Sequence, residues 1–242
     1  MTPLPLVVYL LGPTASGKTG LACELYRRRH CEIINVDSAQ VYRGLDIGSA
    51  KPDAALLREV PHRLIDIRDP AEPYSAAEFC QDAKEAIEAA LAAGRTPVLA
   101  GGTMLYFKVL SEGLAEMPPA DPAIRAELEE EAARLGWSAL HQRLAEVDPR
   151  CAAELHPNHS QRISRALEVY LISGVTMSSW RERQDAAGEG GISGSYRLLQ
   201  LGLEPPERAE LHRRIGQRFA QMLELGLVDE VRALYEIGRA HV

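Results

Sequence analysis

The segment Gly12–Thr19, which reads GPTASGKT, is where residue types and spacing point most directly to chemistry. It matches the pattern GxxxxGK followed by Ser or Thr, and it stands between an apolar run and a helical pattern. Backbone N–H groups at a helix N-terminus bind phosphate oxygens, and the helix dipole supports them. Gly17 would let the backbone approach the phosphate, Lys18 would neutralise its charge, and Thr19 would reach a bound Mg²⁺. This segment, the phosphate loop, predicts a site for a diphosphate or polyphosphate without specifying which.

A second candidate group follows the next apolar run. The run Glu32–Val36 ends at Asp37, and in an open α/β sheet ligands bind at the carboxyl ends of the strands. Asp37 could hold Mg²⁺, orient a nucleophile or act as general base, but an Asp at this position could also simply cap a following helix. The stretch Val41–Pro52 has neither helical nor strand periodicity, and a loop of that length in a compact core is usually functional. We expect Asp37 to face the same crevice as the phosphate loop.

The elements around these groups alternate between strand and helix. Apolar runs of strand length predict strands buried on both faces; they lie at Leu6–Leu11, Glu32–Val36, Arg63–Ile67, Thr96–Ala100 and Tyr196–Leu203. Helical patterns lie at Lys18–Arg29, Ser75–Ala93 and Thr103–Leu110. Ser75 and Glu78 have capping-box spacing, and Gly94 is placed to end that helix. The order predicts an α/β fold, a P-loop NTPase-like parallel sheet flanked by helices.

The pattern changes after Met117-Pro-Pro119. From Asp121 to about Trp180 only helical periodicity is present. Its apolar faces carry Leu128, Leu135, Leu140, Leu144 and Val147. A stretch with loop composition, Ala186–Gly194, comes before the strand pattern that resumes at Tyr196. We therefore expect an α/β core at 1–117, an all-helical insertion at 118–195 and a return to the core at 196–242.

The composition excludes several classes of protein. The chain has 242 residues, of which 46% are hydrophobic and 25% charged, as in ordinary globular proteins. Its net charge of −7 argues against indiscriminate coating of nucleic acid, but it leaves room for a local basic groove. No apolar run approaches the ~20 residues of a spanning helix, and the N-terminal run lacks the flanks of a signal peptide. The four cysteines lack metal-ligand spacing. We expect a cytoplasmic protein with reduced thiols and no membrane contact.

Five blocks of the sequence, taken in order, resemble the tRNA dimethylallyltransferases, also called tRNA isopentenyltransferases or IPP transferases. The blocks read GPTASGKT, NVDSAQVYRGLDIGSAKP, VPHRLIDI, AGGTMLYFK and QRISRALEVY, within about Leu6 to Val231. The resemblance implies transfer of a dimethylallyl group from dimethylallyl diphosphate to N6 of the adenosine just 3′ of the anticodon in tRNA. Diphosphate would be released, Mg²⁺ would assist, and the enzyme would act as a monomer on the tRNA anticodon stem-loop.

The resemblance also implies roles for individual residues. Asp37 would accept the proton from N6 or orient that amine, and Thr19 would serve catalysis as the Mg²⁺ ligand. Diphosphate binding is implied for Gly12, Pro13, Thr14, Ala15, Ser16, Gly17, Lys18 and Thr19, and for an arginine that is either Arg214 or Arg218. Contact with tRNA is implied for Asp37, Ser38, Ala39, Gln40, Thr103, Arg125, Gln161, Arg162, Ile163, Ser164 and Arg165.

Local charge supports an RNA-binding role for the insertion. From His156 to Arg183 there are four arginines against two acidic residues. Arg162 and Arg165 are three residues apart and share a helix face, whereas Ile163 falls on the other. A solvated helix face would explain any one of these arginines. The target base must also leave its stack, and a partly unpaired anticodon loop lowers that cost.

Three alternatives stay open from sequence alone: a small-molecule, nucleoside-type P-loop kinase, an adenylate isopentenyltransferase, and an RNA-binding module with a structural phosphate loop. A helical insertion with Arg162 and Arg165 could act as a kinase lid, so the fold class alone does not exclude the first. The size of the insertion favours a large RNA acceptor over a free nucleotide.

The chain ends at Glu236-Ile-Gly-Arg-Ala-His-Val242, before a Gly-Tyr-Arg-Gln-like block that members of the resembled family carry. The codons GAG ATC GGA AGA GCA CAC GTC would encode this tail and look like a sequencing adapter. We therefore expect the natural gene to continue. The resemblance then implies that the helices that help to close the active-site channel are missing here, and that activity depends on them.

Overall fold

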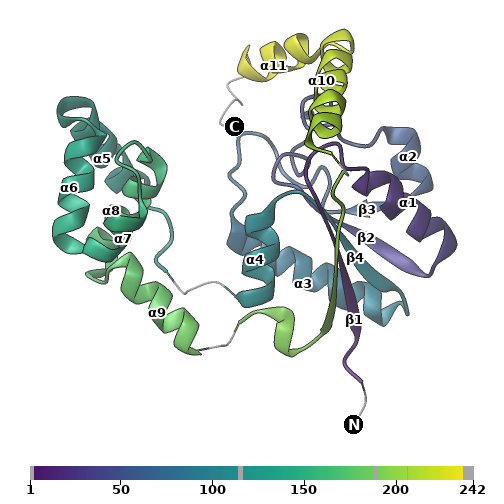
Figure 1. Cartoon of the computed structure of the whole chain (residues 1–242), viewed down its shortest axis with the longest axis horizontal. Coiled ribbons are helices and arrows are strands. Elements are labelled where there is room, and N and C mark those ends of the chain that lie inside the picture. Colours follow the sequence, from purple (N-terminus) through teal and green to yellow (C-terminus); the bar gives the residue numbers. More distant parts are fainter. Residues whose placement is uncertain (1–2, 114–116, 188–189, 206, 237–242) are drawn as a thin grey trace. The chain divides into compact units, whose positions relative to one another are not determined.

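The chain folds into two compact units, one an α/β core and the other all helical. The computed structural model describes residues 3–113, 117–187, 190–205 and 207–236 (Figure 1). The core unit comprises Met1–Glu112 with Gly191–Val242, and the helical unit comprises Gly113–Gly190. The boundaries expected from the sequence, at 117 and 195, lie a few residues later along the chain.

The core unit is built on a five-stranded sheet in the order β3-β2-β4-β1-β5. The strands are β1 (Leu6–Leu11), β2 (Cys31–Val36), β3 (His62–Arg63), β4 (Thr96–Gly101) and β5 (Arg197–Gly202). Every neighbouring pair is parallel, and β4 lies between β1 and β2. The carboxyl ends of these three strands therefore meet at one edge, which confirms the predicted α/β fold.

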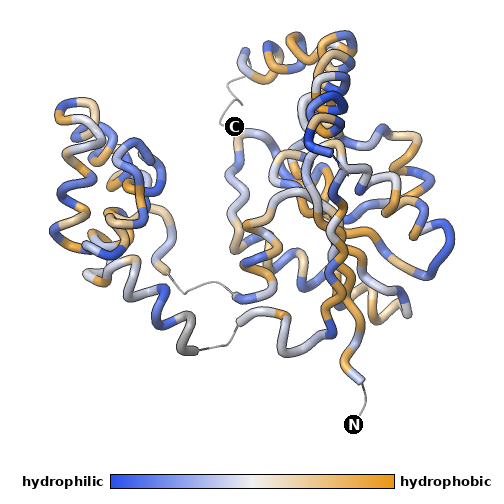
Figure 2. Tube along the Cα trace, viewed as in Figure 1, coloured by the Kyte–Doolittle hydropathy of each residue, from blue (hydrophilic) through white to orange (hydrophobic). Residues whose placement is uncertain are grey.

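Helices cover both faces of this sheet. The helices α1 (Lys18–Arg28) and α2 (Ala54–Glu59) pack on one face, and α3 (Ala76–Ala92) and α4 (Met104–Glu112) on the other. Side chains of β1 alternate between the two layers, because successive residues of a strand point to opposite faces. Each large side chain buried in this way stabilises the fold by about 1.5–3 kcal/mol. Figure 2 shows the hydrophobic segments gathered along the strands.

Local signals at the helix ends are mostly confirmed. The Ser75 hydroxyl accepts a hydrogen bond from the Glu78 backbone N–H, and the Glu78 carboxylate accepts one from the Ser75 N–H, so the predicted capping box is present. Gly94 follows α3 with φ 70°, as a helix stop requires.

The strand predicted at Arg63–Ile67 is wrong beyond Arg63. Leu64 and Asp66 have φ of 62° and 57°, a left-handed conformation that a strand cannot contain.

The helical unit contains α5 (Pro122–Leu135), α6 (Trp137–Val147), α7 (Pro149–Glu154), α8 (Ser160–Ser173) and α9 (Met177–Ala187). Leu128, Leu140 and Leu144 are buried together, as the periodicity predicts, and Val147 packs against them. The prediction that Leu135 lies on the apolar face of its helix is wrong, because this residue ends α5 and is 53% exposed. The stretch predicted as a loop at Ala186–Gly194 contains the end of α9 and a 3₁₀ turn, η1 (Ile192–Gly194). Residues 188–189 of that stretch lie outside the described residues.

The chain returns to the core unit through β5 and ends in two helices, α10 (Arg208–Glu224) and α11 (Leu227–Glu236). Both belong to the described part of the chain, and neither buries a residue completely. The side chains of α10 that are half-buried include Leu211, Arg218 and Met222, which share one face of the helix. Among the described residues, no helix is long and apolar enough to cross a membrane.

Candidate active site

A cavity of about 310 Å³ lies at the carboxyl edge of the sheet. Its walls come from the loops after β1, β2 and β4 and from α10. The residues that line it include Thr14, Ala15, Ser16, Gly17, Lys18, Thr19, Asp37, Gln40, Ser49, Ala50, Gly101, Gly102 and Arg218. The structure thus brings the phosphate loop and Asp37 to one cavity, as the strand order requires.

The phosphate loop follows β1 and leads into α1. Gly17 stands at the N-cap of α1 with φ 90°, and no described side chain caps that helix end. A Cβ atom on Gly12 would lie 2.4 Å from the carbonyl oxygen of Leu203, so only glycine fits where the loop passes β5. The Lys18 Nζ donates hydrogen bonds to the carbonyl oxygens of Gly12 and Pro13, at 2.7 and 2.6 Å. These bonds hold the ammonium group over the loop.

Three charged groups of this cavity affect one another. Burial lowers the pKa of Lys18 below its ordinary value, the Asp37 carboxylate opposes the shift, and Arg218 adds to it. Burial likewise lowers the pKa of Arg218, again opposed by Asp37. Two cations gathered at one partly buried cavity favour a strongly negative ligand there, because such a ligand relieves both their repulsion and their desolvation.

Asp37 is held by the turn that follows it and also faces the cavity. Its Oδ1 accepts hydrogen bonds from the backbone N–H groups of Ala39, at 2.9 Å, and Gln40, at 3.3 Å. Its Oδ2 forms no hydrogen bond with the residues that the structure describes. A turn rather than a helix follows Asp37, so the alternative of a helix cap is wrong. One carboxylate oxygen fixes the orientation of Asp37, and the other is available to a substrate.

The end of β4 is fastened to the end of β2. The Ser38 N–H donates to Thr103 Oγ1 at 3.0 Å, and the Thr103 N–H donates to the carbonyl of Val36 at 3.3 Å. A Cβ atom on Gly101 would lie only 1.9 Å from the Val36 oxygen, so the two strand ends approach as closely as glycine permits. In this structure Thr103 supports the segment that carries Asp37.

The loop from Val41 to Pro52 contributes Ser49, Ala50 and Pro52 to the wall of the cavity. The Gln40 side-chain amide donates to the carbonyl oxygens of Ser49, at 3.0 Å, and Ala50, at 3.3 Å. Ser49 is 8% exposed, and Ala50 and Pro52 line the cavity beside it. Gln40 therefore connects this loop to the Asp37 segment.

The structure separates the two candidate arginines of α10. Arg218 lines the cavity and is half-buried. Arg214 is exposed, and its Nε donates to Glu210 Oε1 of the same helix at 2.7 Å. Helix periodicity alone does not distinguish the two, since Arg214 lies three residues after Leu211 and four before Arg218, on nearly the same face of α10.

Two residues of the cavity lining were not singled out from the sequence. His62 follows the α2 segment, and its Nδ1 lies 2.7 Å from the carbonyl oxygen of Val60, so Nδ1 carries the proton and donates it. Burial lowers the pKa of His62, which favours the neutral ring. Asn35 reaches the cavity from β2 and is 5% exposed. His62 lies in the block VPHRLIDI, and its position in that block could have marked it as a candidate site residue.

The helical unit carries the other residues expected to contact tRNA. Gln161 and Arg162 are exposed on α8, and Ser164 is half-buried. The prediction that Ile163 contacts tRNA is wrong for its side chain, which is completely buried in the core of this unit. Ile163 lies on the inward face of α8, whereas its neighbour Arg162 is exposed.

Arg125 and Arg165 surround a buried carboxylate. Glu168 is fully buried and accepts hydrogen bonds from Arg125 Nε at 2.8 Å, Arg165 Nη1 at 2.5 Å and the Asp121 N–H at 2.8 Å. Burial alone would raise the pKa of Glu168, but these bonds outweigh it and the pKa lies below its ordinary value. The two arginines therefore have a structural role in addition to any contact with RNA.

Comparison with known proteins identifies the family. Residues 40–242 match the family described as IPPT, IPP transferase. The chain belongs to the IPP transferase family, the tRNA dimethylallyltransferases. The tRNA dimethylallyltransferase of Thioalkalivibrio sulfidiphilus is 58% identical over 231 residues, which cover 96% of this chain and 71% of that protein.

Solved structures of IPP transferases have the same fold. The full-length tRNA isopentenylpyrophosphate transferase of Bacillus halodurans is 39% identical, with a TM-score of 0.61 over 98% of this chain and 72% of that one. A eukaryotic dimethylallyltransferase acting on tRNA is 28% identical, with a TM-score of 0.74 over 96% of this chain and 56% of that one. These similarities favour prenyl transfer over the nucleoside-kinase alternative.

Proposed function

We propose that this chain transfers the dimethylallyl group of dimethylallyl diphosphate to N6 of the adenosine 3′-adjacent to the anticodon in tRNA. One observation carries the proposal at the level of residues. Lys18, Arg218 and Asp37, two cations and one carboxylate, line a single cavity in a member of the IPP transferase family.

The donor diphosphate would occupy the phosphate loop. The uncapped N-terminus of α1 offers backbone N–H groups, and Lys18 and Arg218 supply positive charge on the same cavity. When the bond between the allylic carbon and the diphosphate oxygen breaks, the electron pair leaves with that oxygen. Fixed donors and cations at this place stabilise the charge that develops there.

Asp37 would act on the acceptor. The lone pair of the adenine N6 forms the new bond to the allylic carbon, and one N6 proton must then be removed. The carboxylate of Asp37 is oriented by its bonds to the Ala39 and Gln40 amides, and its other oxygen can accept that proton. A well-placed base of this kind typically contributes ~10² to 10⁴ in rate.

The oxygen donors of the cavity fit Mg²⁺. Thr19 contributes a hydroxyl and Asp37 a carboxylate to the same lining, and Mg²⁺ prefers a few protein oxygens together with substrate phosphates. We assign Thr19 as the protein ligand of the ion, beside the oxygens of the diphosphate. When bound, the ion would neutralise charge on the departing diphosphate.

The tRNA would be bound partly by the helical unit. Arg162 and Gln161 are exposed on α8, and among the described residues Arg162 forms no ion pair that would occupy its guanidinium group. A free guanidinium on a helix surface suits a phosphate of the RNA backbone. The adenine would leave its stack to reach Asp37, as chemistry on a base edge requires.

Labelled dimethylallyl diphosphate tests the proposal directly. The chain is incubated with Mg²⁺ and an unmodified tRNA that has adenines beside the anticodon, with AMP as acceptor and ATP without prenyl donor as parallel reactions. We expect label in the tRNA alone. Label in AMP would indicate a free-nucleotide acceptor, and ATP consumption without prenyl transfer would indicate the kinase. A version extended with the C-terminal segment of a relative measures how much that segment contributes.

A further inference from the structure

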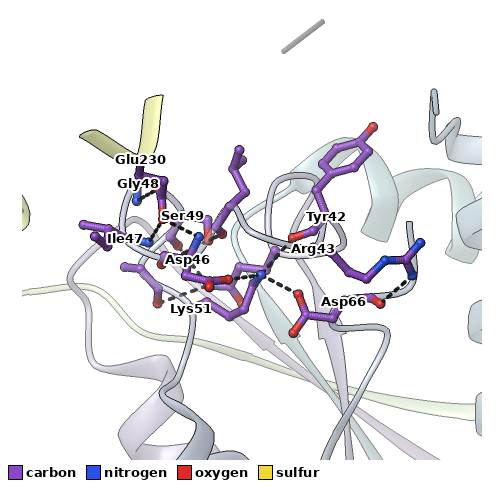
Figure 3. Close-up of polar contacts among 12 residues, drawn as sticks. Tyr42, Arg43, Asp46, Ile47, Gly48, Ser49, Lys51, Asp66 and Glu230 are labelled. Atoms are coloured by element: carbon purple, nitrogen blue, oxygen red, sulfur yellow. Dashed lines mark hydrogen bonds and ion pairs between the residues drawn. The ribbon is translucent and has the colours of Figure 1, made fainter. Parts of the chain in front are cut away.

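The carboxylate of Glu230 on α11 is bound by three successive backbone N–H groups of the loop between β2 and α2 (Figure 3). The Asp46 and Ile47 N–H groups donate to Oε2 at 2.8 and 2.7 Å, and the Gly48 N–H donates to Oε1 at 2.8 Å. Successive N–H groups that converge in this way form a concave anion site in the backbone. Here a side chain from the far end of the chain fills it.

The loop that supplies these groups is internally braced. The Lys51 side chain is 3% exposed, and its Nζ donates to the Tyr42 carbonyl at 2.8 Å, to Asp46 Oδ1 at 2.5 Å and to Asp66 Oδ1 at 2.6 Å (Figure 3). The Ser49 hydroxyl donates to the Leu45 carbonyl at 2.5 Å. A buried ammonium with these partners fixes the turn, so the N–H groups are in place for a carboxylate.

Helix α11 buries little apolar surface beside this contact. None of the described residues of α11 is completely buried, and Val228, Val231 and Tyr235 are 55–76% exposed. Apolar packing therefore contributes little to the position of this helix. A Cβ atom on Gly48 would lie 3.0 Å from Leu227 Cδ1 and 3.4 Å from Glu230 Oε1, so glycine leaves the room that the helix needs. Charge-assisted hydrogen bonds are the strong contacts here.

Both partners of the Glu230 contact, the loop of residues 46–48 and helix α11, are continuous in the chain with segments that line the active-site cavity. On the loop side, Ser49 and Ala50 follow the three N–H groups, line the cavity and accept hydrogen bonds from Gln40. On the helix side, α11 follows α10 after a short turn, and α10 carries Arg218 into the same cavity. A second cavity, of about 640 Å³, is lined by Asp46, Ala50 and Arg218, so the loop and α10 face each other directly.

We propose that Glu230 is a positioning residue for the diphosphate donor: by seating its carboxylate on the N–H groups of residues 46–48, it holds α10 so that Arg218 stays over the phosphate loop. This rests on the proposed function for the identity of the donor. Glu230 touches neither substrate. It acts through Arg218 and through the loop that Gln40 connects to Asp37.

Binding of inorganic diphosphate with Mg²⁺, measured by calorimetry, tests this without any prenyl transfer. Glu230→Ala leaves the three N–H groups unpaired and releases α11, so the fraction of molecules with Arg218 in place falls and the apparent Kd rises, by about tenfold. Glu230→Gln, which keeps one good acceptor, should lie between that variant and the wild type. Asp229→Asn is the matched control, because Asp229 is exposed on the same helix and pairs only with Arg232 among the described residues; it should bind within about twofold of wild type.

A double variant separates positioning from general loosening of the fold. If Glu230 acts through Arg218, the losses caused by Glu230→Ala and Arg218→Ala do not add, and the double variant binds about as weakly as Arg218→Ala alone. Hydrogen exchange at the amides of residues 46–48 should accelerate in Glu230→Ala and remain unchanged in Asp229→Asn. Wild-type diphosphate affinity in Glu230→Ala, or fully additive losses, would overturn the proposal. Failure of the proposed function would instead be seen as wild-type protein that binds diphosphate and transfers no prenyl group.

Discussion

Arg218 of α10 and Lys18 of the phosphate loop line one cavity, and the charge of Arg218 adds to burial in lowering the pKa of Lys18. The two residues come from opposite ends of the chain. Their repulsion is a cost to the protein without ligand, and a diphosphate bound between them would offset it by attracting both cations. The arrangement explains how a phosphate loop can hold a prenyl diphosphate, because the loop recognises phosphate oxygens and the second cation comes from α10.

Replacement of Arg218 should weaken donor binding selectively. A charge-assisted hydrogen bond contributes about 1.5–3 kcal/mol, so Arg218→Ala should raise the KM for dimethylallyl diphosphate about 10- to 100-fold. Steady-state kinetics at saturating tRNA would measure this. Arg214→Ala is the control, since Arg214 pairs with Glu210 on the surface of α10 and should change KM by less than about twofold. The reverse ranking of the two variants would contradict the assignment.

Removal of the Asp37 carboxylate should affect turnover rather than tRNA affinity. We expect Asp37→Ala to reduce kcat by ~10² to 10⁴, because the N6 proton loses its acceptor. Asp37→Asn keeps an oxygen for the Ala39 and Gln40 amides, so it should preserve the local fold while it loses most of the activity. Single-turnover transfer and tRNA binding would be measured on the same preparations. Normal turnover in Asp37→Asn would exclude the proposed role.

The close approach of β2 and β4 predicts that Gly101 cannot be replaced. A methyl group there would lie 1.9 Å from the Val36 carbonyl oxygen, and overpacking of this kind costs about 1–3 kcal/mol. Gly101→Ala should therefore lower Tm by several degrees and reduce transfer, since the ends of both strands carry the site. Gly216→Ala is the matched control: a Cβ atom on Gly216 meets nothing within 4 Å, and alanine favours a helix by up to about 1 kcal/mol. Thermal denaturation would compare the two.

The two arginines of α8 should behave differently. Arg162→Ala should weaken tRNA binding and reduce the slope of log K against log salt by about 1, as loss of one phosphate contact requires. Its thermal stability should stay near that of wild type, because Arg162 is exposed. Arg165→Ala should lower stability, because it removes a partner of the buried Glu168. Filter binding over a salt series, with denaturation of the same variants, would separate the roles. Equal stability of both variants would argue against the structural role of Arg165.

The helical unit should lose stability in acid through Glu168. The pKa of this carboxyl lies below its ordinary value of 4.5, so the folded state binds its proton less readily than the unfolded chain. Its stabilisation is therefore complete above about pH 4.5 and is lost as the pH falls through the pKa of the folded state. Glu168→Gln should lower the free energy of unfolding of the unit by about 3 kcal/mol at pH 7. In this variant the free energy of unfolding should also fall less as the pH is lowered. Glu182→Gln, in an exposed pair with Arg150, should change little. Denaturation between pH 3 and 7 would test both.

Much of the fold and of the site could be predicted from the sequence by local rules. The phosphate loop is continuous in the chain, so its glycines, its lysine and its place between strand and helix are all visible in Gly12–Thr19. Asp37 was placed at the site because strand ends in a parallel sheet share an edge. The capping box of Ser75 and Glu78 likewise depends only on neighbouring residues. The early end of β3 was not predicted, since the left-handed backbone at Leu64 and Asp66 is accompanied by hydrogen bonds to the distant residues Asn35, Gln40 and Lys51, which no local pattern marks.

Tertiary structure alone decided the contacts between distant segments. Arg214 and Arg218 have the same chemistry, and only the packing of α10 shows which of them reaches the cavity. Glu230 appears in the sequence as one more surface charge, and its partners are backbone N–H groups, which every residue except proline carries and which no motif marks. A sequence determines local conformation through short-range sterics and hydrogen bonding. Which distant groups meet depends on how the whole core packs, and that geometry brings Arg218 to the cavity and Glu230 to the backbone of residues 46–48.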